Sequence, residues 1–93
     1  MSNLILACWA ASEEFLKYGH LIDSIRVLEG LCTKVNFDRK PMLEVRTRIR
    51  LASILLKYTE NHSHAKFHLE KAQIKLSDIK VKNKCSKRLN NIL

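Results

Sequence analysis

Two histidines, His64 and His68, are the residues best spaced for chemistry, because positions four apart share one face of a helix. Such a pair can occupy two coordination positions of a transition metal. No Cys, Asp or Glu follows at an offset that supplies a third ligand, so no metal site is expected. The two glycines of the chain are too few for a phosphate-binding loop, and no cofactor is expected. No motif for a serine nucleophile or a zinc protease is present either, so we expect a protein that is not an enzyme.

The three cysteines, Cys8, Cys32 and Cys85, lack the spacing and the even number of a disulfide framework, which indicates a reducing compartment. Cys32 lies on an apolar face and is expected to be a small core residue rather than a nucleophile. The apolar run 4–11 is short and follows no basic residues, unlike a secretory signal. No window reaches the roughly 18 apolar residues of a membrane span. We therefore expect a soluble intracellular protein without a membrane partner or a small-molecule substrate.

The charge of this 93-residue chain is uneven. Its formal charge is +8, and residues 34–93 hold 15 basic and five acidic side chains. Within them, segment 80–88 carries five basic residues and no acidic one. A basic half of this kind permits direct nucleic-acid binding, and the short basic run permits nuclear import or phosphate binding. The alternatives are a solvated basic surface and a frayed, solvated terminus.

The elements that position these residues are expected to be helices. Apolar residues recur with helical spacing over residues 3–18, 20–33, 41–60 and 62–78. Gly19 suits the turn after the first helix, and Pro41 suits the first position of the third. Two glycines and one proline in the whole chain argue against a turn-rich β fold.

The two helix pairs repeat one another. The triplet Leu-Lys-Tyr at 16–18 recurs at 56–58, and the second copy continues with Ala65-x3-Leu69-x2-Ala72. The equivalent positions in the first copy, 41 residues earlier, are Ser24, Leu28 and Leu31. The second copy is similar to the A-x3-F-x2-A pattern of the tetratricopeptide repeat. The sequence thus predicts an all-α fold of two stacked antiparallel hairpins, the start of an α-solenoid, with a plain four-helix bundle as the alternative.

The boundaries follow from the repeat. The hairpins are expected at 3–33 and 41–79, within one domain that spans residues 1–79. Residues 80–93 are expected to form a basic C-terminal tail.

Segment 41–72, with residues 28–32 upstream, carries a second resemblance. The residues that carry it are Leu28-Glu-x-Leu-Cys32, Glu44-Val-Arg46, Leu51, Leu55-Leu56-x-Tyr58-Thr59-x-Asn61 and Ala65-Lys-x-His68-Leu-Glu-Lys-Ala72. This pattern resembles the N-terminal repeats of the chromatid cohesion factor family, the tetratricopeptide-repeat subunits of the cohesin loader. The resemblance implies an all-helical superhelix that encloses the extended N-terminal segment of the large loader subunit. It also implies a nuclear, non-catalytic role in loading cohesin on chromatin, which the subunit contacts indirectly.

In tetratricopeptide hairpins, an extended peptide lies across the first helix of each pair. Applied to this chain, the motif predicts that the partner-binding residues are Leu6, Trp9, Glu13 and Lys17 from the first unit and Thr47, Arg50, Ile54 and Lys57 from the second. Trp9 is the strongest anchor, although packing between the hairpins explains it equally well. A small basic nucleic-acid-binding protein is the alternative function.

Overall fold

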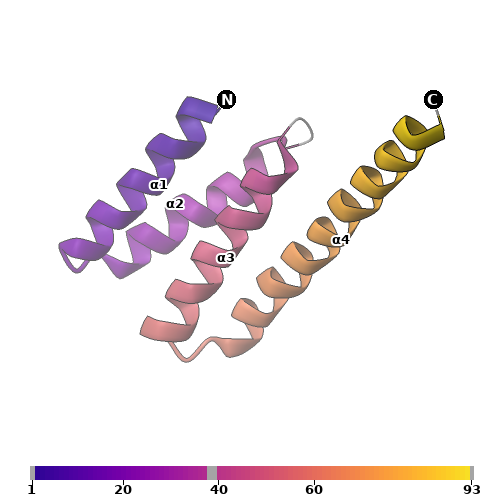
Figure 1. The fold of residues 1–93 in the computed structure, drawn as a ribbon. Coiled ribbons are helices and arrows are strands. Elements are labelled where there is room, and N and C mark those ends of the chain that lie inside the picture. Colours follow the sequence, from indigo (N-terminus) through magenta and orange to yellow (C-terminus); the bar gives the residue numbers. More distant parts are fainter. Residues whose placement is uncertain (1, 38–39, 93) are drawn as a thin grey trace.

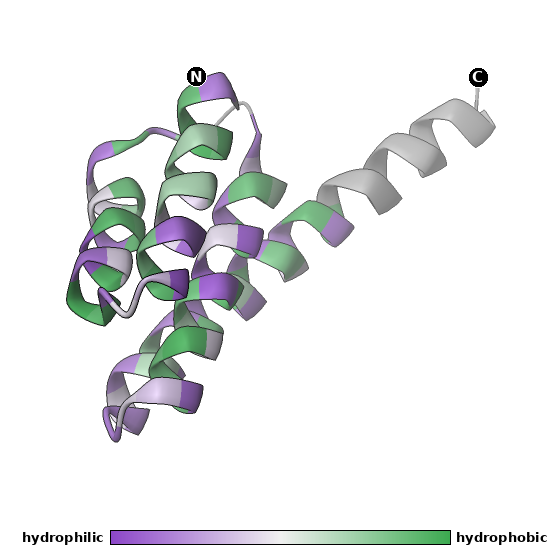
Figure 2. Ribbon diagram, turned by 90° about the vertical axis from the view of Figure 1, so that its left-hand side faces the viewer, coloured by the Kyte–Doolittle hydropathy of each residue, from purple (hydrophilic) through white to green (hydrophobic). Residues whose placement is uncertain are grey.

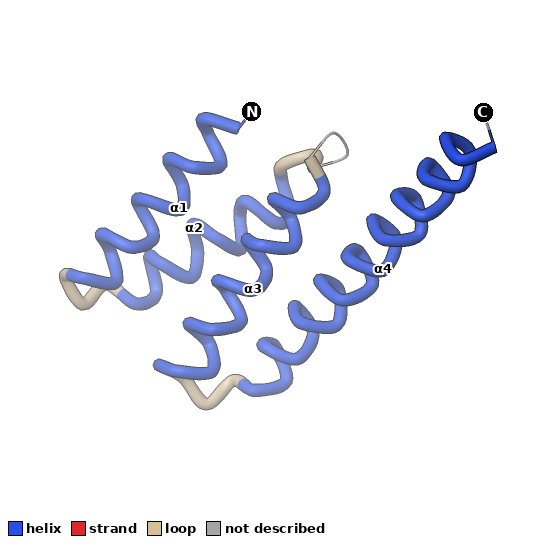
Figure 3. Tube along the Cα trace, in the orientation of Figure 1, coloured by secondary structure: helices blue, strands red, loops and turns tan. Residues whose placement is uncertain are grey.

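A computed structural model describes the backbone of residues 2–37 and 40–92 and the side chains of residues 3–37 and 40–81. The described backbone forms helices α1 (Ser2–Lys17), α2 (Leu21–Lys34), α3 (Pro41–Tyr58) and α4 (His62–Ile92) and no strand (Figure 3). The predicted all-α class is confirmed. None of the described helices is long and apolar enough to cross a membrane.

Each helix packs against its neighbours in chain order. The packed pairs are α1 with α2, α2 with α3 and α3 with α4. Helices α1 and α2 form one antiparallel hairpin, and α3 and α4 form the next, so α1 and α4 lie on opposite sides of the molecule (Figure 1). This order is consistent with the start of a helical array of the tetratricopeptide type, in which each hairpin packs against the next one.

The turn between α1 and α2 is determined by Gly19. Its φ of 82° is the left-handed conformation that an L side chain rarely adopts. The amide of Gly19 donates to the carbonyl of Leu16 at 3.1 Å, and the amide of His20 donates to that of Phe15 at 2.7 Å. These two bonds form a Schellman motif, which satisfies carbonyls that the end of a helix leaves free. The turn predicted at this glycine is confirmed.

The second hairpin begins at Pro41, which occupies the first turn of α3 as predicted. Helix α4, however, does not end near residue 78 as the sequence pattern indicated, because it continues to Ile92. Neither glycine nor proline occurs after Pro41, so no residue interrupts the helical backbone there. The backbone of the predicted basic tail therefore extends α4, and the tail's side chains beyond Val81 lie outside the described residues.

The core consists of two hydrophobic clusters that meet at Trp9. The larger cluster joins α2, α3 and α4 through Leu28, Leu51, Ala52, Leu55 and Ala65. The smaller one joins α1 and α2 to the loop before α3 through Ile5, Leu31 and Phe37. Trp9 is half-buried and packs against both. Its position makes it a packing residue between the hairpins.

The buried face of α4 differs from the expected one at one position. Ala65 and Ala72 are buried as predicted, whereas the expected core residue Leu69 is 41% exposed. His68 takes the place between the two alanines and is buried. His68 and Leu69 lie about 100° apart around the helix, on either side of the line through Ala65 and Ala72, and α4 is rotated so that His68 faces the neighbouring helices and Leu69 does not.

Large hydrophobic side chains also remain on the surface. Figure 2 shows hydrophobic residues, in green, in every helix. On α3, Met42, Ile49 and Leu56 recur every seven residues, and each is at least one-third exposed. These side chains leave part of the apolar surface of α3 exposed.

Candidate partner-binding surface

Helices α1 and α3, the first helices of the two hairpins, are linked by four of the predicted site residues. The indole Nε1 of Trp9 donates to the hydroxyl Oγ1 of Thr47 at 2.9 Å. The guanidinium Nη1 of Arg50 donates to Oε1 of Glu13 at 2.7 Å. The Arg50 guanidinium carbon also lies 4.9 Å from the centre of the Trp9 ring, a cation–π arrangement. The fold thus brings Trp9, Glu13, Thr47 and Arg50 together.

Thr47 is the buried member of this group and holds Trp9 in place. Its side chain is fully buried, and its hydroxyl donates to the carbonyl of Leu43 at 2.6 Å while it accepts from Trp9. A buried hydroxyl has no surface for a partner, so the direct contact expected of Thr47 is replaced by a role in holding Trp9. The ring of Trp9 keeps some exposure, but its only hydrogen-bond donor is already used.

Glu13 and Arg50 form the charged part of the surface. Their side chains are 64% and 41% exposed. An exposed ion pair contributes little to stability, because water solvates both groups when they separate. Either group can therefore exchange its present partner for a charge on another chain at low cost.

Three other predicted residues are accessible on the two helices. Leu6 is 51% exposed on α1. Lys17 and Lys57 are exposed at the last turns of α1 and α3, where each Nζ lies over the ring of the following tyrosine, at 5.8 Å and 5.2 Å respectively. The repeated Leu-Lys-Tyr triplet thus produces the same local arrangement twice.

Ile54 is the remaining predicted residue, on α3. It is partly buried and packs against the larger core cluster. Of the eight predicted residues, seven therefore retain surface and Thr47 does not.

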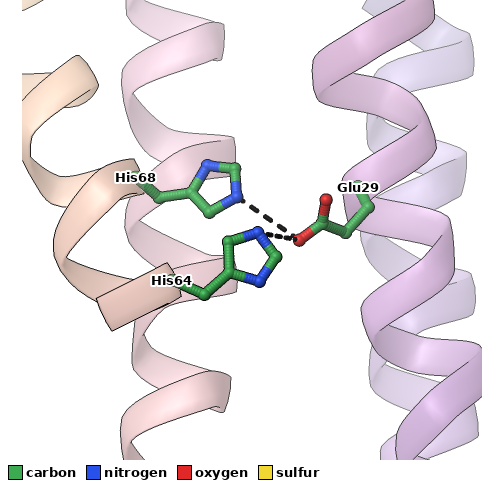
Figure 4. A group of neighbouring side chains, drawn as sticks. All are labelled: Glu29, His64 and His68. Carbon is green, nitrogen blue, oxygen red and sulfur yellow. Dashed lines mark hydrogen bonds and ion pairs between the residues drawn. The ribbon is translucent and has the colours of Figure 1, made fainter. Parts of the chain in front are cut away.

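A second polar cluster lies between α2 and α4, and sequence reasoning missed it. Oε1 of Glu29 lies 2.8 Å from Nε2 of His64 and 3.4 Å from Nε2 of His68 (Figure 4). The expectation that no acidic residue accompanies the two histidines is wrong, because Glu29 belongs to the other hairpin. Sequence offset alone gives no signal for a carboxylate that arrives from a separate helix.

Arg48 extends this cluster toward α3. Its Nη1 lies 2.8 Å from Nδ1 of His68, and its Nε donates to Oε2 of Glu44 at 3.0 Å. Nζ of Lys75 lies 3.8 Å from Oε1 of Glu44. Burial is the main cause that lowers the pKa of His68. The negative charge of Glu29 raises this pKa, whereas the positive charge of Arg48 lowers it. The net effect on His68 favours the neutral form of the imidazole.

Comparison with known proteins identifies relatives over most of the chain. The family model described as cohesin loading factor matches residues 8–85. The chain is 38% identical over 72 residues to the sister chromatid cohesion protein SCC4 of Arabidopsis thaliana. That match covers 76% of this chain but 10% of the relative, so the chain spans about a tenth of the relative's length. No solved structure matches the chain. The resemblance drawn from residues 28–32 and 41–72 is thereby confirmed.

Proposed function

Since the chain belongs to the cohesin loading factor family, we propose that it forms part of a non-catalytic subunit that supports cohesin loading in sister chromatid cohesion. We further propose that the α1–α3 surface binds an extended N-terminal segment of the large loader subunit. This surface consists of the seven accessible predicted residues of the two helices, Leu6, Trp9, Glu13, Lys17, Arg50, Ile54 and Lys57. The chain then acts in the nucleus and contacts cohesin and chromatin indirectly, through that subunit.

The observation that carries the binding proposal is the mixed character of one strip across α1 and α3. Leu6 and the half-buried Trp9 offer apolar contact, whereas Lys17, Arg50 and Lys57 offer positive charge. An extended peptide crosses the first helices of stacked hairpins and uses both kinds of contact. The excess of positive charge favours a segment in which acidic side chains alternate with apolar ones.

Isothermal titration calorimetry of the 93-residue chain with a peptide of that segment tests the proposal. Leu6→Asp removes an apolar contact from an exposed position, and a Lys17→Glu/Lys57→Glu double variant reverses two charges. Each change is expected to weaken binding about tenfold or more. Arg26→Glu, an exposed charge reversal on α2, is the matched control and is expected to leave affinity within about twofold.

Thermal melting provides an independent measurement, because a peptide that binds only the folded chain raises the midpoint. Equal losses for Arg26→Glu and the α1–α3 variants, or no binding of the peptide, would contradict the assigned surface. Nucleic-acid binding, the alternative function, would appear as a shift of duplex DNA whose affinity falls steeply with salt.

A further inference from the structure

The cluster of Glu29, His64 and His68 has the composition and geometry of a metal site, and nothing in the family relationship calls for one. The three donor atoms come from two different hairpins and all lie within 4.8 Å of one another. We propose that these residues bind one Zn²⁺ ion, with water as the fourth ligand, and that the ion fastens α2 to α4.

The distances fit such an ion with small side-chain movements. Zinc bonds of about 2.0–2.2 Å in a tetrahedron place neighbouring ligand atoms about 3.4 Å apart. The carboxylate oxygen of Glu29 is 2.8 Å from Nε2 of His64 and 3.4 Å from Nε2 of His68. The two rings lie one helical turn apart, with centres 4.9 Å from each other, and both face Glu29 (Figure 4).

The chemistry of the donors favours zinc over the abundant hard cations. Two imidazole nitrogens and one carboxylate oxygen suit a borderline metal, whereas Ca²⁺ and Mg²⁺ prefer oxygen ligands throughout. His68 is 3% exposed at its side chain, while His64 and Glu29 are 35% and 29% exposed. The site therefore has one buried ligand that fixes its position and an open side through which an ion and a water molecule enter.

Arg48 sets the affinity of this site. A guanidinium only donates, so its contact with Nδ1 of His68 places the ring proton on Nε2, the nitrogen that faces Glu29. Zinc needs the lone pair of that Nε2. On binding, Nε2 releases its proton to solvent, Nδ1 takes up a proton from solvent, and Arg48 leaves His68. Its existing bond to Glu44 keeps Arg48 paired after this release.

The experiment uses the 93-residue chain after treatment with a chelator. Calorimetry with ZnCl₂, absorption spectra with CoCl₂ and thermal melting give affinity, ligand type and stability. We expect one ion per chain, a tetrahedral cobalt spectrum without thiolate-to-metal absorption, and a higher melting midpoint with zinc. The missing thiolate absorption separates this site from the cysteines.

Three variants and one control decide the assignment. His64→Gln and Glu29→Gln change partly exposed ligands and are expected to weaken zinc binding about tenfold or more. Arg48→Gln is expected to strengthen it severalfold, because it removes both a cation and the donor that holds the wrong tautomer. His20 is an exposed histidine between α1 and α2, and His20→Gln should leave the zinc affinity unchanged.

A hydrogen-bonded network without a metal role would behave differently. Circular dichroism checks that the variants stay helical. If helical His64→Gln or Glu29→Gln protein binds zinc as tightly as the wild-type chain, or if Arg48→Gln brings no gain, the proposal is overturned. Zinc binding that is lost equally in His20→Gln, or cobalt spectra with thiolate absorption, would overturn it as well.

Discussion

The indole N–H of Trp9 donates to the hydroxyl of Thr47 at 2.9 Å, across 38 residues of chain. The same hydroxyl donates onward to the carbonyl of Leu43, so Thr47 is both acceptor and donor. This chain of hydrogen bonds joins the first helix of one hairpin to the first helix of the next. It fixes the orientation of Trp9, the one tryptophan in the protein, where the two core clusters meet.

Replacement of Thr47 by valine tests that link. Thr47→Val preserves the branched shape but removes the hydroxyl, which leaves the Trp9 donor without its partner. We expect the free energy of unfolding to fall by about 1–2 kcal/mol, measured by urea denaturation. Ser53→Ala removes an exposed hydroxyl from the same helix and is expected to change it by less than about 0.5 kcal/mol. Equal effects of the two substitutions would contradict a role for the bond.

Leu28 is the central side chain of the larger core cluster, with no exposed surface. Leu28→Ala removes apolar contacts and leaves a cavity, and such changes cost about 2–5 kcal/mol. We expect a loss of this size by urea denaturation, which in a chain this short removes most of the stability. Leu56→Ala makes the same change at a side chain that is 49% exposed, and less than about 1 kcal/mol is expected there.

The two glycines are expected to respond to alanine with opposite signs. Gly19 has a φ of 82°, so Gly19→Ala places a β-carbon in a left-handed conformation and costs about 1 kcal/mol. Gly30 lies within α2, and a β-carbon there would meet no atom within 4 Å. Gly30→Ala is therefore expected to stabilise the protein by up to about 1 kcal/mol. Thermal melting of both variants checks the sign, and a stabilised Gly19→Ala would contradict the Schellman turn.

The raised pKa of Cys32 predicts that the stability of the protein decreases at alkaline pH. Burial raises the pKa of its thiol from 9.0 to about 11, against the opposing charge of Arg48. Between these values the unfolded chain loses this proton and the folded chain keeps it. The contribution of Cys32 to stability is thus complete below pH 9 and is lost as the pH rises toward 11.

Urea denaturation at pH 8, 9 and 10 measures this effect. A Cys8→Ser/Cys85→Ser variant leaves Cys32 as the only thiol, and the same variant with Cys32→Ala is its control. The first protein is expected to lose more stability than the second as the pH rises, because the two proteins differ only in the thiol of Cys32. Parallel pH profiles would show that the thiol ionises freely in the folded state.

The sequence by itself determined the helices, the order in which they pair and the family. Helical periodicity, the glycine of the first turn and the proline of the third helix act over a few residues, so they can be recognised locally. The arrangement in hairpins was indicated by two further features. These are the triplet repeated at 16–18 and 56–58 and the small residues Ala65 and Ala72. The same information failed for the end of α4, since the chain after residue 78 contains no signal that would place its end.

Only the tertiary structure decided which distant side chains meet. The pairing of Trp9 with Thr47, the burial of His68 in place of Leu69 and the approach of Glu29 to two histidines depend on how far one helix slides and rotates against the next. A rotation of a single residue position, about 100°, exchanges a buried side chain for an exposed one. Sequence spacing fixes positions along each helix but leaves that rotation to the packing of the whole core.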